Sequence, residues 1–188
     1  MVMMKNLILY KSGKRIEVPI KRASNDKLFS LVPIDNNSLF NRTSSWQTAF
    51  SLREYDNHGY IIVDTSKKKK TYISGTGMYV EGSIVYGGEG KFNSNCPEKS
   101  RMLHHPGSRL DKEWEKNKET WVAVAVGWGM LKEEAEAWEA LFLHENAHLL
   151  TKRGTEWIEG NLINIMPEKR NYELKTKKLI KEEIWKSL

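Results

Sequence analysis

The sequence predicts a mixed α/β (α+β) domain in which helices flank a small antiparallel or mixed sheet. Short apolar and β-branched runs dominate the first half of the chain, an unbroken apolar run follows at residues 121–126, and helical patterns dominate the end. Strands that precede a strand–helix unit and then further helices are typical of α+β and mixed α/β folds. A chain of 188 residues is also long enough to bury a hydrophobic core.

The first half is expected to consist mostly of strands. The runs 6–10 and 15–20 flank a short polar turn and predict a β-hairpin. Residues 21–57 show no clear hydrophobic periodicity, and within them a short helix is expected at residues 46–52. Further strands are expected at residues 59–64, 71–74 and 77–86, with Glu81-Gly82 as a tight turn inside the last of these segments.

The second half is expected to contain helices around one strand. Asn95 and Pro97 favour the start of a short helix over residues 97–105. The run 121–126 does not alternate, which predicts a strand buried on both faces, ended by Gly127 and Gly129. Other helices are expected at residues 110–118, at 132–152 before Gly154, and at the C-terminus, where Leu174, Ile180, Ile184 and Leu188 share one side.

Charge and cysteine content narrow the class of protein. The net charge of +6 fits a polyanionic partner. The single Cys96 excludes an internal disulfide framework and a cysteine-based zinc finger, and it suits a reducing cytoplasm, where we expect the protein to act. No apolar run approaches the roughly 20 residues of a membrane span, so no membrane partner is expected.

Two tyrosines are the first candidate site residues. If Glu81-Gly82 is a two-residue turn, Tyr79 and Tyr86 are diagonal neighbours on one sheet face. Two adjacent phenols can hold a water molecule or a phosphate oxygen. The alternative is an aromatic cross-strand pair that only packs the sheet.

A cation pair and a carboxylate complete the candidate set. Arg101 and His105 are four residues apart and would share one helical face, where an arginine can clamp a phosphate and a histidine can transfer a proton. Glu139 projects to the edge of the apolar side of its helix, and a carboxylate there is costly unless it is paired or binds a metal. The alternatives are an exposed basic helix and a structural glutamate. The residues expected to define the apolar side are Ala135, Trp138, Phe142, Leu149 and Leu150, with Ala140 facing away.

The order tyrosine, tyrosine, arginine, histidine, glutamate resembles the GIY-YIG nuclease family, in the manner of a restriction-endonuclease-like member. The resemblance covers roughly residues 77–164, through "GMY", "VYGG", "RMLHH" and "EAEAWEALFL", with Asn164 of "GNLIN" as a late asparagine. A competing assignment takes Tyr60 and Tyr72 as the motif tyrosines.

The resemblance implies a Mg²⁺ (or Mn²⁺) ion on Glu139 and in-line attack of water on a phosphodiester. A tyrosine whose pKa is lowered by nearby cations would help to deprotonate that water, aided by Lys91 or by a lysine of the run Lys67, Lys68, Lys69 and Lys70. The same four lysines would contact DNA phosphates, unless they form only a solvated turn.

The partner implied is double-stranded DNA, cut by a Mg²⁺-dependent endonuclease of the type II restriction kind. Cutting both strands of a symmetric site would need a homodimer. We divide the chain into an N-terminal β-containing extension at residues 1–58 that would serve DNA recognition, a GIY-YIG-like catalytic core at residues 59–166, and a C-terminal helix at residues 167–188.

A rival motif overlaps the glutamate helix. His144-Glu145-Asn146-Ala147-His148 fits H-E-x-x-H, in which two histidines on successive helical turns bind Zn²⁺ and the glutamate acts as general base of a metalloprotease. Glu156 or Glu159 would supply a third ligand. A third alternative is a basic nucleic-acid-binding module without hydrolytic activity.

Overall fold

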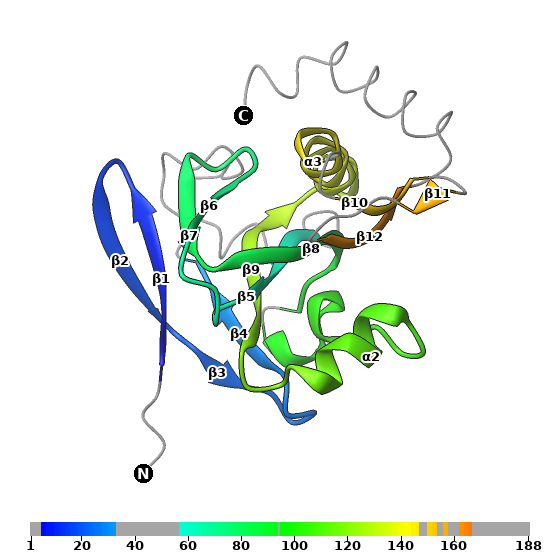
Figure 1. The fold of residues 1–188 in the computed structure, drawn as a ribbon, viewed down its shortest axis with the longest axis horizontal. Coiled ribbons are helices and arrows are strands. Elements are labelled where there is room, and N and C mark those ends of the chain that lie inside the picture. Colours follow the sequence, from blue (N-terminus) through cyan, green and yellow to red (C-terminus); the bar gives the residue numbers. More distant parts are fainter. Residues whose placement is uncertain are drawn as a thin grey trace.

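The computed structural model describes residues 5–32, 57–93, 95–146, 150–153, 156–157 and 162–166. It confirms a mixed α/β fold, in which α-helices pack against antiparallel and mixed sheets (Figure 1). The helix expected at residues 46–52 and the C-terminal helix lie outside the described residues.

The predicted N-terminal hairpin is confirmed and belongs to a four-stranded antiparallel sheet. Ser12 and Gly13, both with positive φ, form the tight turn that suits the twist of a hairpin. The sheet has the order β2-β1-β7-β6 and consists of β1 (Asn6–Lys11), β2 (Lys14–Pro19), β6 (Lys70–Ile73) and β7 (Met78–Glu81). We call it the small sheet.

The second sheet, which we call the main sheet, has the order β3-β4-β9-β5-β8. Among the described strands of this sheet, β4 and β9 run parallel, and the other neighbouring pairs run antiparallel. The predicted doubly buried strand is confirmed in β9, but it does not end at Gly127, because Gly127 and Trp128 pair with Gly59 and His58 across two bulges. The strands are β3 (Lys21–Arg22), β4 (Leu28–Leu31), β5 (Asn57–Asp64), β8 (Ser83–Lys91) and β9 (Trp121–Met130).

The predicted hairpin at residues 77–86 is wrong, because β7 and β8 belong to different sheets. β7 pairs with β1 and β6, whereas β8 pairs with β5. The chain crosses between the sheets at Gly82, which has a φ of 137° and donates its N–H to Lys69 O over 2.7 Å. A Cβ on Gly82 would lie 2.6 Å from Val63 Cγ1, so the crossing needs glycine.

Residues before 59 join the same sheets as the residues after it. The proposed boundary between residues 58 and 59 falls inside β5, and β4 and β1 hydrogen-bond with β9 and β7. A third, three-stranded sheet has the order β11-β10-β12, with β10 at Leu150–Arg153, β11 at Glu156–Trp157 and β12 at Leu162–Met166.

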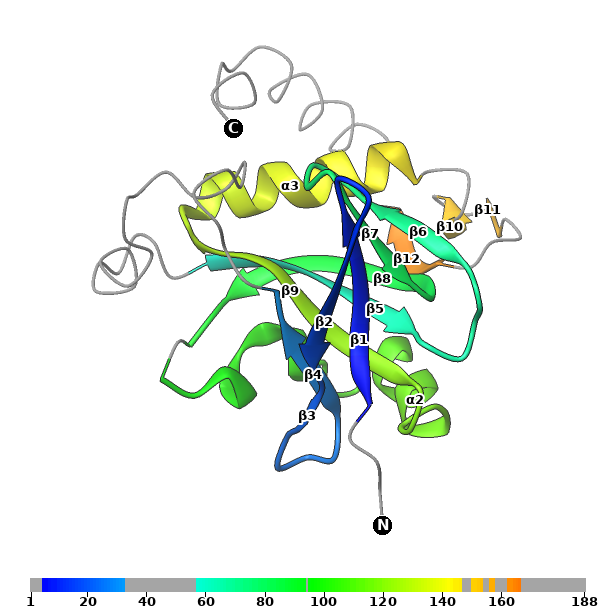
Figure 2. The same ribbon diagram turned by 90° about the vertical axis from the view of Figure 1, so that its left-hand side faces the viewer.

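Helices cover both faces of the main sheet (Figure 2). Helix α3 (Lys132–Glu145) lies on one face, and α2 (Arg109–Lys116) lies on the other, so the expected helix at 110–118 is confirmed. The expected helix at 97–105 is instead two 3₁₀ turns, η2 (Pro97–Lys99) and η3 (Arg101–Leu103), because Ser100 between them is extended.

The long helix is shorter than predicted. It ends at Glu145, where the Asn146 side chain donates to Phe142 O over 2.8 Å and satisfies a terminal carbonyl. The chain enters β10 at Leu150, so the expected helical position of Leu150 is wrong, while Leu149 lies outside the described residues. Ala140 is buried rather than outward-facing.

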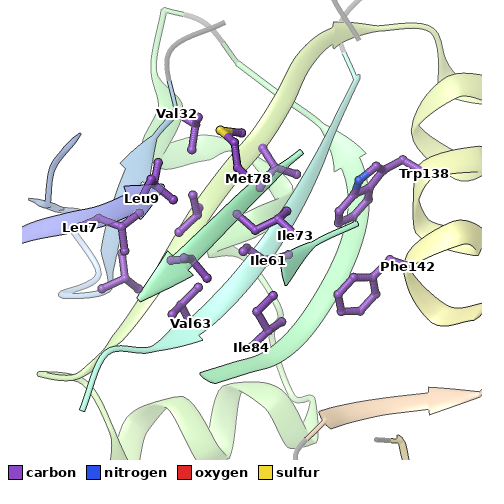
Figure 3. Close-up of a cluster of buried hydrophobic side chains, with 14 of the residues drawn as sticks. Leu7, Leu9, Val32, Ile61, Val63, Ile73, Met78, Ile84, Trp138 and Phe142 are labelled. Atoms are coloured by element: carbon purple, nitrogen blue, oxygen red, sulfur yellow. The ribbon is translucent and has the colours of Figure 1, made fainter. Parts of the chain in front are cut away.

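Two hydrophobic clusters lie on opposite faces of the main sheet. The larger one fills the space between the main sheet, the small sheet and α3 (Figure 3). Trp138 and Phe142 stack on each other at 5.5 Å and pack where Gly59 and Gly87 carry no side chain. The second cluster lies under α2 and the 3₁₀ turns and includes Tyr60, Met102 and Trp114.

We predict that Gly87→Ala destabilises the fold by about 1–3 kcal/mol, because the new methyl group would lie 2.3 Å from Phe142 Cε1. Urea unfolding measures the cost. In a Phe142→Leu background the cost of Gly87→Ala should shrink, since the ring that clashes has gone. An equal cost in both backgrounds would contradict this packing.

Candidate active site

The two tyrosines that meet are Tyr60 of β5 and Tyr86 of β8. Their ring centroids are 6.1 Å apart, and both rings lie on the α2 face of the main sheet. Tyr60 is buried and Tyr86 is half-buried. The pair therefore combines one tyrosine from each of the two sequence assignments.

The other two candidate tyrosines lie elsewhere. Tyr79 and Tyr72 face each other on the small sheet, with ring centroids 5.3 Å apart, and both are exposed. The expected contact between Tyr79 and Tyr86 is wrong because the chain changes sheet between them. Tyr72 does not pair with Tyr60 either, because β6 belongs to the small sheet and β5 to the main sheet.

His105 lies against both site phenols. Its ring centroid is 5.7 Å from that of Tyr60 and 5.6 Å from that of Tyr86, and its Nε2 is 3.1 Å from Tyr60 Oη. Burial, and then the charge of Arg101, lower the pKa of His105 to about 3. Which of the two groups donates in the contact between His105 Nε2 and the Tyr60 hydroxyl depends on the tautomer of the imidazole.

Arg101 brings a positive charge to the rim of this cluster. Its stem packs on Gly90, where a Cβ would lie 2.4 Å from Arg101 Cγ. Its Nη1 donates to His104 O over 2.7 Å, and the side chain is otherwise exposed. The guanidinium lowers the pKa of Tyr60, Tyr86 and His105, so its field reaches all three groups.

Arg101 and His105 do not share a helical face as predicted. Arg101 opens η3, and the chain is already extended at His104, with a φ of −122° and a ψ of 99°. This bend, rather than an α-helical repeat, turns His105 inward and leaves Arg101 at the surface. His104 faces away, with its Nε2 2.7 Å from Glu98 O.

Glu139 approaches the phenols from α3. The buried Trp138 and Phe142 pack α3 against the main sheet. The half-buried Glu139 side chain therefore lies on the helix that contacts β8, the edge strand of this sheet. The negative charge of Glu139 raises the pKa of both Tyr60 and Tyr86. Its expected position at the edge of the buried side of the helix is therefore consistent with the structure.

The expected lowering of a tyrosine pKa is wrong. Burial raises the pKa of Tyr60 well above 10, and burial with the charge of Glu139 raises that of Tyr86. Arg101 opposes both shifts but does not outweigh them. Both phenols are therefore protonated near neutral pH and act first as hydrogen-bonding groups.

Metal binding at this site would involve Glu139. Among the described residues, no three histidine, cysteine, aspartate or glutamate side chains gather into a metal-binding group. One carboxylate, completed by phosphate oxygens and water, suits Mg²⁺, which keeps several waters and is often held by one or two carboxylates. Glu139 alone does not form a metal site, and it would be one ligand of a cation that a phosphate substrate and water complete.

The H-E-x-x-H segment is described only in part. His144 and Glu145 are exposed in the last turn of α3, which ends at Glu145. His148 lies outside the described residues, so the zinc alternative stays a prediction.

The remaining candidates lie apart from the phenols. Lys91 ends β8 on the face opposite to Tyr86, since it lies five positions after Tyr86 and side chains of a strand alternate between the faces. Four exposed lysines lie between β5 and β6, and the last of them begins β6. They are Lys67, Lys68, Lys69 and Lys70. Asn164 belongs to β12.

His58 is a site residue that sequence reasoning missed. It is buried, stacks on Tyr60 at 5.1 Å, and donates from Nδ1 to Gly90 O over 2.7 Å. Its Nε2 is buried without a hydrogen-bond partner among the described residues, and burial lowers its pKa to about 4. Its position two residues before Tyr60 in a strand places it on the same face, which is the signal that identifies it.

No family model, curated protein or solved structure matches this chain. Within the described ranges, no helix has the length and apolar character needed to cross a membrane.

We predict that stability falls as the pH drops below about 6.5, because His58 and His105 stay neutral in the folded protein while the unfolded chain takes up protons. A histidine with a lowered folded pKa stabilises fully above its unfolded pKa of about 6.5, and that stability is lost toward pH 4 and 3 respectively. His105→Gln should reduce the slope of unfolding free energy between about pH 6.5 and 5 by up to about 1.4 kcal/mol per pH unit.

Urea unfolding at a series of pH values tests this slope. The matched control is His104→Gln, which changes an exposed imidazole and should leave the slope as in the parent. Identical slopes for His105→Gln and the parent would show that His105 is protonated in the folded protein.

Proposed function

We propose that the chain is a Mg²⁺-dependent DNA endonuclease with its reaction site at Tyr60, Tyr86, Arg101, His105 and Glu139. One observation carries the proposal: Tyr60, Tyr86 and His105, which are far apart in the sequence, lie against each other, and the charges of Arg101 and Glu139 reach both phenols. Two phenols, a neutral imidazole, a guanidinium and a carboxylate are suited to binding and hydrolysing a phosphodiester. The order of these residue types supports a GIY-YIG-like enzyme.

Arg101 would bind the phosphate group of the substrate. Its stem is seated on Gly90, and one nitrogen holds His104 O, so the guanidinium is oriented while further N–H groups remain to bind phosphate oxygens. A fixed cation at this place would stabilise the charge that develops on the phosphorus oxygens in the transition state.

Tyr60, Tyr86 and His105 position the attacking water. Tyr86, the half-buried phenol, would hold the attacking water, because Tyr60 is buried and its hydroxyl lies 3.1 Å from His105 Nε2. The water oxygen bonds to phosphorus and the bond to O3′ breaks, which leaves a 5′ phosphate and a 3′ hydroxyl. The proton that the water loses would pass through solvent to the leaving O3′, while His105, whose pKa is lowered to about 3, stays neutral and holds the Tyr60 hydroxyl in place.

A Mg²⁺ ion held by Glu139 would polarise the phosphate and stabilise the leaving oxygen when bound. Glu139 also determines how the phenols behave, since its charge raises the pKa of Tyr60 and Tyr86. Compensation of that charge makes both phenols stronger acids. The carboxylate thereby couples cation binding to the acidity of the residues beside the water.

The substrate we propose is DNA, cleaved in the manner of a type II restriction enzyme in the cytoplasm, with a homodimer needed for cutting both strands of a symmetric site. The net charge of +6 supports a polyanionic substrate.

We predict that the parent protein cleaves plasmid DNA in the presence of Mg²⁺ and that Glu139→Ala lowers the cleavage rate by at least about 100-fold while it still binds DNA, because the cation loses its protein ligand. Gel analysis of nicked and linear plasmid measures cleavage, and a filter or anisotropy assay measures binding. Undiminished cleavage by Glu139→Ala would remove this residue from the mechanism.

We further predict that Tyr86→Phe lowers cleavage by about 10²-fold or more, because the phenol hydroxyl lies beside the reacting groups. Tyr79→Phe is the matched control, since it removes the same atom from the other candidate tyrosine and should cleave like the parent. His144→Ala should also cleave normally. The opposite pattern, with Tyr79→Phe inactive, would return the site to the hairpin that the sequence alone favours.

A further inference from the structure

The solvent face of the small sheet carries a row of tyrosines. Tyr10 of β1 pairs with Tyr79 of β7, and Tyr79 pairs with Tyr72 of β6, so the three rings lie side by side across adjacent strands. Tyr72 and Tyr79 are 41% and 46% exposed, and they are the large hydrophobic side chains that the described residues leave most open. The opposite face of the same strands buries Leu9, Val80 and Ile73 in the core, so packing does not require the outer aromatic row.

Cations flank this row. Lys70 Nζ lies 3.8 Å from the centroid of the Tyr10 ring, and Arg15, which forms an ion pair with Glu17, is the cross-strand partner of Tyr10 on the other side. An aromatic row beside Lys70 differs from a simple hydrophobic contact surface, because the ammonium group attracts negative charge.

A basic cleft of about 580 Å³ adjoins the row. Ile8 lines the cleft and lies two residues before Tyr10 on the same strand face, and Lys70 both lines the cleft and covers Tyr10. The cleft and the row therefore form one continuous surface. Its charged lining residues are Lys5, Lys67, Lys68, Lys69, Lys70 and Glu81.

We propose that this surface binds single-stranded nucleic acid, with bases stacked on Tyr72 and Tyr79 and phosphates in the lysine cleft. Exposed aromatic rings on an antiparallel sheet beside a basic groove are suited to unpaired bases, whose ring faces are free, whereas the base faces of a duplex are covered by their neighbours. Five lysines against one glutamate provide the charge complementarity for the phosphates.

The surface is distinct from the proposed nuclease site, and the inference goes beyond the proposed function. Binding to this surface requires neither Mg²⁺ nor hydrolysis, so it is measured separately from cleavage.

The test is fluorescence anisotropy of the full-length protein in EDTA, with a labelled oligothymidylate and with a labelled hairpin duplex carrying the same number of phosphates. The single strand should bind more tightly than the duplex. The double variant Tyr72→Ala/Tyr79→Ala should weaken binding of the single strand by at least about fivefold, while Tyr72→Phe/Tyr79→Phe keeps most of the affinity, because stacking needs the ring and not the hydroxyl.

A salt titration tests the cleft. Lys68→Ala/Lys69→Ala should reduce the slope of log K against log salt by about 1.4, whereas Lys116→Ala/Lys118→Ala, which removes two exposed lysines near α2, should leave it unchanged. Equal reductions in both variants would show that only net charge matters and would overturn the assignment of the cleft.

Other outcomes overturn the proposal as a whole. Tighter binding of the duplex, or a loss of affinity in the phenylalanine variant as large as in the alanine variant, would exclude base stacking. A change of oligomeric state in light scattering without a change in affinity would show instead that a second copy covers the tyrosines. If single-strand binding holds and plasmid cleavage is absent, only the proposed nuclease function fails.

Discussion

Three glycines of β8 make the arrangement of the candidate active site possible. Gly87 admits the ring of Phe142 from α3 on one face of the main sheet, while Gly88 and Gly90 admit the Tyr60 ring and the Arg101 stem on the other. In each case a Cβ would lie less than 3.0 Å from the neighbouring side chain. The edge strand can therefore be approached from both sides, and the carboxylate of α3 comes near a cluster that lies mainly on the opposite face.

The electrostatics of the site is a balance between burial and two opposite charges. Burial and Glu139 keep the phenols of Tyr60 and Tyr86 protonated, and Arg101 counteracts this only in part. Burial and Arg101 together keep His105 neutral. The unliganded site thus holds neutral hydrogen-bonding groups between a fixed cation and a fixed anion, an arrangement that a bound phosphate and a divalent cation would change most strongly.

The crossing at Gly82 separates two surfaces that are adjacent in the sequence. Tyr79 lies before the crossing, on the open face of the small sheet, and Tyr86 lies after it, in the half-buried site of the main sheet. The first position is accessible but has no catalytic neighbours among the described residues, and the second is surrounded by His105 and Tyr60. This division supports one surface for binding and another for chemistry.

The sequence by itself determined the fold class, the N-terminal hairpin and the doubly buried strand, because periodicity and residue type are local properties. It also singled out Arg101, His105 and Glu139 as candidates. Only the tertiary structure decided which tyrosines meet, since a turn signal such as Glu81-Gly82 does not show whether two successive strands pair with each other or with distant partners. The pairing of β8 with β5 brings Tyr60 to Tyr86 and adds His58 to the site. The pKa directions of the phenols follow from that burial, which no local pattern contains.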